Sequence, residues 1–352
     1  MPAINKLQLN ELINQAIKNN AVAIYFNIGS YPIMKINGAL KDLTDQPILT
    51  KEFLNTVSNT LLPDEKKNFL QEKKELTIGY NWSDDVRLSV NFFYQKNSLS
   101  ITIKLVSNQV RNLSDLNFPK VINDINNFNS GLIIICGPVS SGRTTSVVSL
   151  IQDINTKYQK RIVTIEEPIE YQFINEESMI QQREIGQDVD SFVNGLRDVI
   201  DEDVDIVYLS KIGKPEEIKL ALEVAAAGKL VLTVMDSNSA LIVLNRIYSS
   251  FKSTEEEWAK GLISGTLRAI INQRLLKKNG GGLILASEIF IMNSSTKSII
   301  KSGKFDQLKS IIQTSRQEGM QSLDVSLNAL LNKGLISPEE AQKFMSNTSE
   351  SL

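Results

Sequence analysis

Apolar positions in the first hundred residues switch between helical and strand spacing. Between Leu9 and Ile17 they recur at the spacing of one helical face, which predicts an amphipathic helix. Strand-like runs follow at 21–28 and 32–36, and the turn pair Asn37-Gly38 predicts a hairpin after the second run. Further strand-like runs, separated by Ser, Asp and Asn, lie at 76–82, 86–94 and 99–106. We therefore expect a small α+β domain in this part of the chain.

The pattern beyond residue 130 alternates strand with helix. Nearly continuous apolar runs lie at 131–136, 161–167, 204–209 and 229–235. Such runs are typical of parallel strands that helices cover on both faces, so they predict a doubly wound α/β core. From Glu255 onward the pattern is mostly helical, apart from glycines at 280–282 and a strand-like run at 283–292.

A polar segment separates the two patterns. Residues 107–130 are rich in Asn, Ser and Asp, which predicts a linker. We expect an amino-terminal domain at 1–106 and a second domain at 131–352 that ends in helices. A chain of 352 residues has the length of two ordinary domains.

Composition narrows the possible chemistry. The chain has no histidine, which excludes imidazole bases, Ser-His-Asp triads and mixed Cys/His zinc sites. A formal net charge of −2 provides no global positive field that would attract nucleic acid. The single cysteine, Cys136, and the lack of a leader-like start predict a cytoplasmic protein. No apolar run approaches the roughly 20 residues that span a bilayer.

The stretch GPVSSGRTTS has the glycine spacing of a phosphate-binding loop and lies between an apolar strand and a helix. In such loops, backbone N–H groups and the helix amino terminus bind phosphate, and a hydroxyl like that of Thr144 can hold Mg²⁺. Arg143 stands where these loops carry lysine, and its longer, planar head would displace or over-reach the γ-phosphate. Binding can therefore persist where turnover does not. The alternative, which Ser140 in place of a glycine favours, is a tight turn without a ligand.

A second polar feature is TIEEPIEY at 164–171. Its carboxylates Glu166, Glu167 and Glu170 follow a strand of the predicted parallel sheet, at the edge where α/β proteins bind ligands. A role in binding metal or water is one interpretation. Composition alone favours the other, a solvated strand exit at which Pro168 ends the hydrogen-bonded ladder.

Several stretches follow one another in the order of a known family, namely GPVSSGRTT, KRIVTIEEPIEY, QQREIG, SFVNGLRD, AGKLVLTVMDSNSA, INQRLL, GGGLILASEIF and GMQSLDVSLNALLNKGLIS. From about residue 28 to its end, the chain closely resembles the PilT-like retraction motors of bacterial type IV pili. The resemblance implies a PAS-like amino-terminal domain and a RecA-like ATPase domain. It also implies a hexameric ring that binds ATP between subunits beneath the pilus base, at the cytoplasmic face of the inner membrane.

Many positions match the family's motifs. The matching positions are Gly137, Pro138, Ser141, Gly142, Thr144 and Thr145 in the loop, Glu166 and Glu170 in the acidic box, and Arg183, Glu184 and Arg197. Of the amino-terminal arginines that resemble fingers acting in trans, Arg87 remains, while Ser89 and Lys104 occupy two other positions. If Mg²⁺ binds at all, the resemblance assigns it to Thr144 and Glu166.

Other positions depart from the family where it performs chemistry. Lys211 stands at the position of the catalytic glutamate, and Gly213-Lys214 replaces an Arg-Asp pair. Lys229 and Asp236 replace two histidines. Each change alone has a simple explanation, such as a surface charge at Lys229. At 295–302, lysines replace two arginines and Ser302 replaces a glutamate, so any coupling to retraction there is in doubt and a helix packed on the core is the simpler interpretation.

Hydrolysis of ATP needs a carboxylate that orients and polarises the attacking water. The ammonium group of Lys211 cannot accept that proton and would repel Mg²⁺. We therefore hypothesise that Lys211 pairs with Glu166 or Glu167 and replaces the metal. The predicted catalytic positions are thus Glu166, Glu170, Arg87 and Lys211, the last of which replaces the catalytic glutamate.

Three classes of function remain. The first is a hydrolysis-deficient subunit, which forms a ring with itself or with a PilT-like paralogue on the inner-membrane pilus platform and binds ATP weakly or not at all. The second is a divergent but active retraction ATPase that recruits another carboxylate, such as Glu167. The third, a nucleic-acid motor, is disfavoured by the acidic pI of about 5.6 and by the lack of a basic stripe with interleaved aromatic residues.

Overall fold

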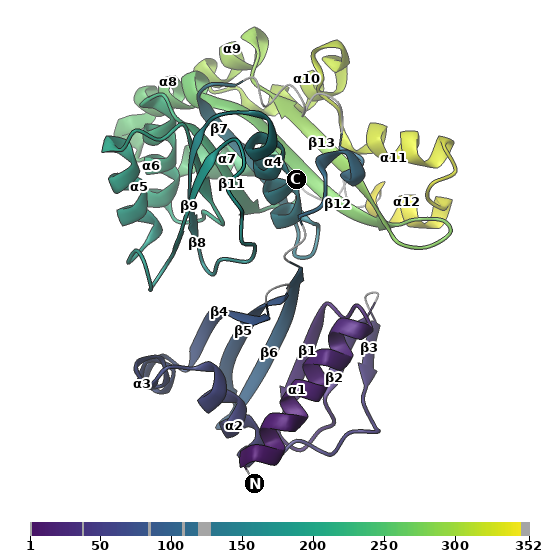
Figure 1. The fold of residues 1–352 in the computed structure, drawn as a ribbon. Coiled ribbons are helices and arrows are strands. Elements are labelled where there is room, and N and C mark those ends of the chain that lie inside the picture. Colours follow the sequence, from purple (N-terminus) through teal and green to yellow (C-terminus); the bar gives the residue numbers. More distant parts are fainter. Residues whose placement is uncertain (1, 37–38, 84–85, 108–109, 119–127, 346–352) are drawn as a thin grey trace. The chain divides into compact units, whose positions relative to one another are not determined.

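The computed structural model describes residues 2–36, 39–83, 86–107, 110–118 and 128–345. The chain divides into two compact units. The first contains residues 1–109 and 167–172, and the second contains 110–166 and 173–352. The two units are coloured by sequence in Figure 1.

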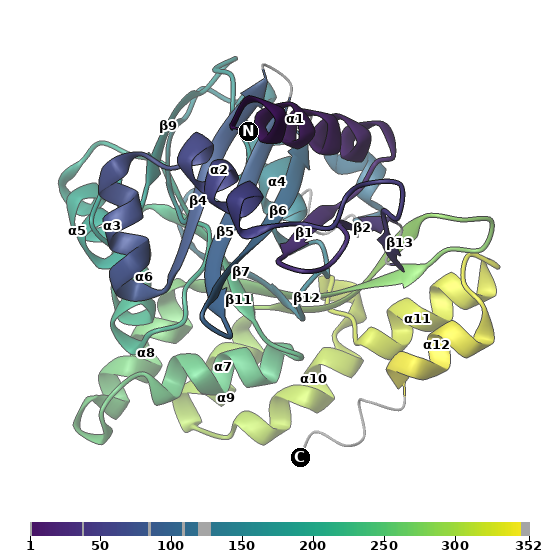
Figure 2. The same cartoon turned by 90° about the horizontal axis from the view of Figure 1, so that it is seen from below.

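The first unit is an antiparallel sheet with helices packed on it. Its strand order is β3-β2-β1-β6-β5-β4. The strands are β1 (Ala23–Asn27), β2 (Ile33–Ile36), β3 (Ala39–Asp42), β4 (Glu75–Ser83), β5 (Val86–Gln95) and β6 (Ser98–Ser107). The helices are α1 (Pro2–Lys18), α2 (Lys51–Leu61) and α3 (Asp64–Lys73). Figure 2 shows these helices in front of the strands.

The elements predicted for this unit are confirmed. Leu9, Leu12, Ile13 and Ala16 of α1 are fully buried in one core with residues of α2 and the sheet, whereas Ile17, at the end of the predicted face, is exposed. The strands β4, β5 and β6 form from the three predicted runs and pair in sequence order. Strands β2 and β3 pair as a hairpin. The turn predicted at Asn37-Gly38 lies outside the described residues.

The second unit contains a mostly parallel sheet in the order β13-β12-β7-β11-β10-β8-β9. Its strands are β7 (Gly131–Gly137), β8 (Arg161–Glu166), β9 (Met179–Glu184), β10 (Ile206–Leu209), β11 (Leu230–Asp236), β12 (Leu267–Lys277) and β13 (Leu283–Ile291). Only β13 runs antiparallel to its neighbour, β12. The four predicted parallel strands are confirmed as β7, β8, β10 and β11, so the α/β fold class is confirmed.

Helices cover both faces of this sheet. They are α4 (Arg143–Lys157), α5 (Phe192–Asp201), α6 (Pro215–Ala226), α7 (Ala240–Ser249) and α8 (Glu256–Thr266), followed by α9 (Ser294–Ser302), α10 (Leu308–Thr314), α11 (Leu323–Asn332) and α12 (Pro338–Met345). Alternate residues of β7 face opposite sides: Ile134 packs with α5–α8, whereas Ile133 and Ile135 pack with α4. The predicted doubly wound core follows from this alternation.

The carboxyl-terminal helices extend the core along β12 and β13. α11 and α12 lie side by side next to β13, as Figures 1 and 2 both show. Leu276 of β12 and Ile284 of β13 pack with Leu327 of α11 in a separate apolar cluster. The segment 295–302 lies within α9, where Ile300 is fully buried, so the interpretation as a packed helix is confirmed.

Two strands were not predicted. The expectation of mostly helical structure after Glu255 is wrong for β12, whose apolar run is interrupted by Asn272, Gln273 and Arg274. These polar residues hide the strand pattern, yet all three are buried. Hydrogen bonds to one another and to neighbouring elements offset the cost of burying them. The edge strand β9 is half-buried and polar, with the sequence MIQQRE, which carries little strand signal.

Part of the predicted linker is helical. The predicted linker contains a short 3₁₀ helix, η1 (Leu113–Leu116), in which Leu113 is buried on the α4 side of the second unit's sheet. Among the helices of the described residues, none is long and apolar enough to cross a membrane.

The close approach at the start of β7 gives a testable prediction. Gly131 has φ +123, and a Cβ placed there would lie 2.6 Å from the carbonyl oxygen of Thr266. We expect Gly131→Ala to lower the free energy of unfolding by roughly 2–4 kcal/mol, because the backbone is strained and the clashing atom belongs to the main chain. The midpoint of urea denaturation measures the change.

Gly261, in the middle of α8, is the matched control, since a Cβ there would meet nothing within 4 Å. Gly261→Ala should raise the free energy of unfolding by up to about 1 kcal/mol through helix propensity. Equal effects of the two substitutions would contradict the steric account of Gly131.

Candidate functional site

The predicted phosphate-binding loop joins β7 to α4. β7 ends at Gly137, the loop occupies 138–142, and α4 begins at Arg143 with Gly142 as its N-cap residue. Because Gly142 has no side chain, it cannot cap the first N–H groups of α4, which leaves them to a ligand or to solvent. The predicted order of strand, loop and helix is thus confirmed.

Gly137 fixes the shape of this loop. It has φ +156, and a Cβ there would lie 2.7 Å from the carbonyl oxygen of Gln273 and would collide with Ser141 Oγ. Ser141 is 3% exposed, and its buried hydroxyl has no hydrogen-bond partner among the described residues. A buried polar atom without a partner is costly unless a ligand or water satisfies it. The loop therefore fits the phosphates of a nucleotide.

The rest of the loop keeps the conformation of such motifs despite one substitution. Ser140 is exposed and has φ +67, a left-handed conformation that glycine would adopt more readily. Pro138, Thr144 and Thr145 are half-buried, the two threonines in the first turn of α4. Cys136, directly before the loop, is fully buried, and this burial raises the pKa of its thiol. The thiol is therefore protonated and inert at neutral pH.

Arg143 forms an ion pair with Asp236 through its Nη1 and the carboxylate Oδ1. The Arg143 side chain is 14% exposed, whereas that of Asp236 is 74% exposed. Asp236 is the last residue of β11 and stands opposite Gly137 in the parallel pairing of β11 with β7. Two positions that the resemblance presented as separate departures are thus direct partners. The adjacency of β7 and β11, which could have revealed the pair, is not encoded in chain order.

Glu166 ends β8 and is 1% exposed. Its Oε1 accepts hydrogen bonds from Thr164 Oγ1 at 2.7 Å and from Gln182 Nε2 at 3.0 Å. The interpretation of the acidic box as a solvated strand exit is therefore wrong for Glu166. No group of three or more Asp, Glu or Cys side chains suited to a metal ion occurs among the described residues.

The other acidic residues and the predicted arginine finger belong to the first unit. Residues 167–172, which include Glu170, cluster with that unit, as does Arg87. Arg87 is 7% exposed, and it donates to the Ile169 carbonyl oxygen and to Asn81 Oδ1, each at 2.5 Å. The predicted site residues are thus divided between the two units.

Lys211 is exposed and lies in the segment that follows β10. Its pairing with Glu166 or Glu167 stays a prediction. Nearby, Glu217 Oε2 accepts hydrogen bonds from the backbone N–H groups of Gly213 and Lys214, both at 3.0 Å, at the start of α6. The pair Gly213-Lys214 therefore serves as a helix start where the family carries charged Arg-Asp.

Lys229 is not a surface charge, which corrects the simple explanation for this substitution. It is 8% exposed, and its Nζ donates to the carbonyl oxygens of Glu202 at 2.6 Å and Val204 at 3.4 Å, just after α5. The Glu202 carboxylate in turn pairs with Arg161 at 2.9 Å and with Arg183 at 2.8 Å. Lys229 thus joins β11 to the end of α5.

Sequence reasoning missed the polar residues of β12 that support the loop region. Gln273 Nε2 donates to Ser146 Oγ in α4 at 2.8 Å. Arg274 Nη2 and Asn272 Nδ2 each donate to the Asn238 carbonyl oxygen at 2.8 Å, in the segment after Asp236. Burial lowers the pKa of Arg274, whose guanidinium lies among these polar groups. Because β12 was not predicted, no sequence signal placed these side chains near the loop.

Comparisons with known proteins agree with this geometry. Residues 2–282 match the family model described as type II/IV secretion system protein. The chain is 30% identical to a twitching motility protein of Neisseria gonorrhoeae, over 91% of this chain and 86% of the relative. It is 28% identical to the type IV pilus retractation ATPase PilT of Pseudomonas aeruginosa, over 96% of this chain and 98% of the relative.

Solved structures give the same result. A crystal structure of the pilus retraction motor PilT with bound ADP is similar to this chain with a TM-score of 0.84 and 31% identity, over 95% of this chain and 96% of the motor. The ATPase DotB of Legionella pneumophila has a TM-score of 0.81 at 20% identity, over 97% of this chain and 96% of DotB, and shares the fold.

The buried Lys229 yields a test of its structural role. Lys229→Met keeps the length of the side chain but removes the donor, so two carbonyl groups near the end of α5 lose a partner. We expect the free energy of unfolding to fall by about 1–3 kcal/mol. Urea denaturation followed by tryptophan fluorescence or circular dichroism measures the loss.

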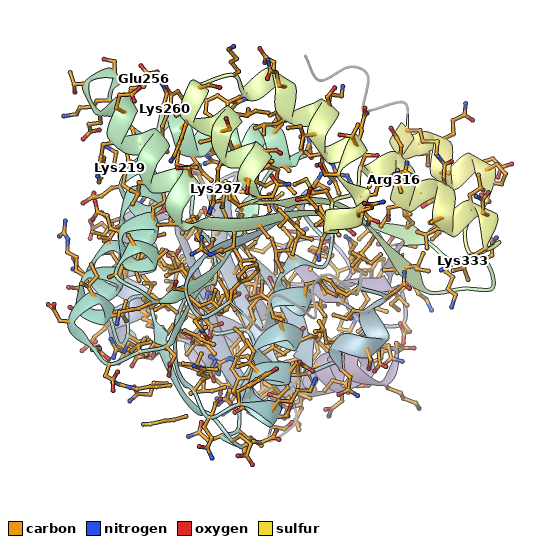
Figure 3. All side chains as sticks on the ribbon, turned by 90° about the horizontal axis from the view of Figure 1, so that it is seen from above. Lys219, Glu256, Lys260, Lys297, Arg316 and Lys333 are labelled. Carbon is orange, nitrogen blue, oxygen red and sulfur yellow. The ribbon has the colours of Figure 1, made fainter. Side chains whose placement is uncertain are left out.

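Lys333→Met is the matched control, because Lys333 is exposed on the outer surface beside α11, as Figure 3 shows. Its effect should stay within about 0.5 kcal/mol. If Lys229→Met were as neutral as the control, Lys229 would not hold α5 in place.

Proposed function

Since this chain belongs to the type II/IV secretion system protein family, among the PilT-like retraction ATPases of type IV pili, we propose that it is a pilus retraction motor subunit that no longer hydrolyses ATP. It keeps the loop that binds nucleotide phosphates and lacks the charges that drive turnover. Its role is then to form or regulate the ring rather than to drive retraction by hydrolysing ATP.

The ion pair between Arg143 and Asp236 carries this proposal. In a phosphate-binding loop, the cation after the second glycine reaches the terminal phosphates and stabilises the charge that develops on them during transfer. Here that cation is already neutralised by a carboxylate, and a planar guanidinium replaces the compact ammonium of lysine. Stabilisation of the transition state, commonly the largest contribution to such catalysis, is therefore reduced.

Lys211 supports the same conclusion from a second position. By resemblance, it occupies the place of the glutamate that polarises water, and an ammonium group cannot accept a proton from that water. The buried carboxylate of Glu166 already accepts hydrogen bonds from Thr164 and Gln182. It is thus a poor substitute for the missing base.

The family suggests the setting of this subunit. We propose that it assembles into a hexameric ring, with copies of itself or with an intact paralogue, on the platform protein at the inner face of the inner membrane. Mg²⁺, when bound, would neutralise phosphate charge, and Thr144 and Glu166 are the residues that would hold it. No nucleic acid takes part, since the formal net charge is −2.

ATP turnover by the purified protein tests the loss of hydrolysis. We expect its rate to be at least about a hundredfold below that of an intact PilT relative assayed in parallel, as for the loss of one transition-state donor. The double variant Arg143→Lys, Lys211→Glu should raise the rate about tenfold or more above wild type, because it restores both the compact cation and the base. Phosphate release measures both rates.

A loop-disrupted variant, Gly137→Ala, controls for contaminating motors, because a Cβ there collides with Ser141 and Gln273. Phosphate release that persists in this control does not come from the chain. Turnover of the wild type at the rate of the intact relative, absent in the control, would reject the proposal in favour of a divergent but active retraction ATPase.

A further inference from the structure

We infer that Asp236 makes the phosphate-binding loop selective for nucleoside diphosphates over nucleoside triphosphates. This inference rests on the proposed function only in that the loop binds nucleotide. It assigns a specificity-determining role to a residue whose family counterpart is a histidine. A subunit of this kind would bind ADP, the product of hydrolysis by neighbouring subunits, in preference to ATP.

The groups that would bind the inner phosphates are intact and do not involve the side chain of Arg143. They are the backbone N–H groups at the start of α4 and the hydroxyls of Thr144 and Thr145. The Ser141 hydroxyl is buried and without a partner among the described residues, which independently marks the loop as a place for a ligand. A diphosphate can therefore use this set of contacts.

The surroundings of the third phosphate are less favourable than those of the inner two. In such loops the residue at 143 reaches the terminal phosphates. Its guanidinium is here bound by the Asp236 carboxylate, so its positive charge is cancelled where a third phosphate would need it. That phosphate would also bring further negative charge close to a carboxylate. Like charges at short range disfavour binding, and the penalty is partly screened because Asp236 is 74% exposed.

The backbone of Asp236 is fixed beside the loop. It pairs with β7 opposite Gly137. The segment that follows is held by Asn272 and Arg274 at the Asn238 carbonyl oxygen, and Glu288 Oε2 accepts a hydrogen bond from the Ala240 N–H at 2.9 Å. The backbone that carries the carboxylate is therefore held on both sides along the chain, and the ion pair with Arg143 holds the carboxylate itself. The hydrogen bonds of Asn272 and Arg274 in β12 thus help to position Asp236, the residue that disfavours a third phosphate.

Equilibrium binding of ADP and of a non-hydrolysable ATP analogue to the full chain, by calorimetry with Mg²⁺, tests the inference. We expect ADP to bind at least about tenfold more tightly than the analogue. Asp236→Asn keeps the size of the side chain but removes the charge and releases Arg143, so it should reduce the preference to less than about threefold, mainly through tighter binding of the analogue. High salt should narrow the preference of the wild type.

Two variants serve as controls. Asp236→Glu retains the charge and should retain a preference for ADP, which separates a charge effect from a general disturbance of β11. Asp306→Asn removes an exposed carboxylate in the 3₁₀ helix η4 (Phe305–Gln307), far along the chain, and should leave the preference unchanged.

The outcomes separate this inference from the proposed function. Equal or tighter binding of the ATP analogue by the wild type, an unchanged preference in a folded Asp236→Asn variant, or no binding of either nucleotide would each overturn the selectivity. The first two results do not bear on hydrolysis, which the turnover assay decides, whereas a lack of binding would also contradict the nucleotide binding in the proposed function. Conversely, ATP turnover by the wild type would reject the proposed loss of activity while leaving the binding ratio to be judged on its own.

Discussion

The parallel register of three neighbouring strands determines the chemistry of the second unit. β7 lies between β11 and β12, and this pairing places Asp236 opposite Gly137 and Asn272 opposite Cys136. The ends of β7 and β11 thus lie together beside the middle of β12, at the edge where α/β folds bind ligands. A slip of one residue would turn each side chain to the opposite face. The ion pair at Arg143 and the polar network of β12 both depend on this register.

The charged residues at 143, 214, 229 and 236 all take part in ordinary structural interactions. Asp236 neutralises Arg143, Lys229 donates to carbonyl groups after α5, and the backbone of Lys214 is capped by Glu217. Each of these groups thus has a bonding partner within the second unit. A partly buried charge is costly without a partner, and these contacts provide one for Arg143 and Lys229.

The sequence predicted the parts of the fold in which local pattern and tertiary environment agree. The continuous apolar runs of β7, β8, β10 and β11 became parallel strands, and the face of α1 became core. β12 escaped prediction because Asn272, Gln273 and Arg274 are polar yet buried, and only the tertiary structure provides their partners. The edge strand β9 packs one face only weakly, so its composition carried little signal.

The candidate site was predictable to the same degree. Glycine spacing located the loop, because the backbone conformation that phosphate needs restricts residue choice locally. The partner of Arg143 was not predictable, since β8, β9 and β10 separate β7 from β11 along the chain although β7 and β11 are neighbours in the sheet. The grouping of residues 167–172 with the first unit likewise depends on contacts between segments distant in sequence.

The position of Cys136 has a practical consequence. It is the only cysteine of the chain, it is fully buried in the central strand β7, and it directly precedes the phosphate-binding loop. A thiol reagent can reach it only when β7 separates from its neighbours. Labelling kinetics of the unmodified polypeptide would therefore report the opening of this one strand without background from other sulfhydryl groups, and any molecule that tightens the loop would slow the modification.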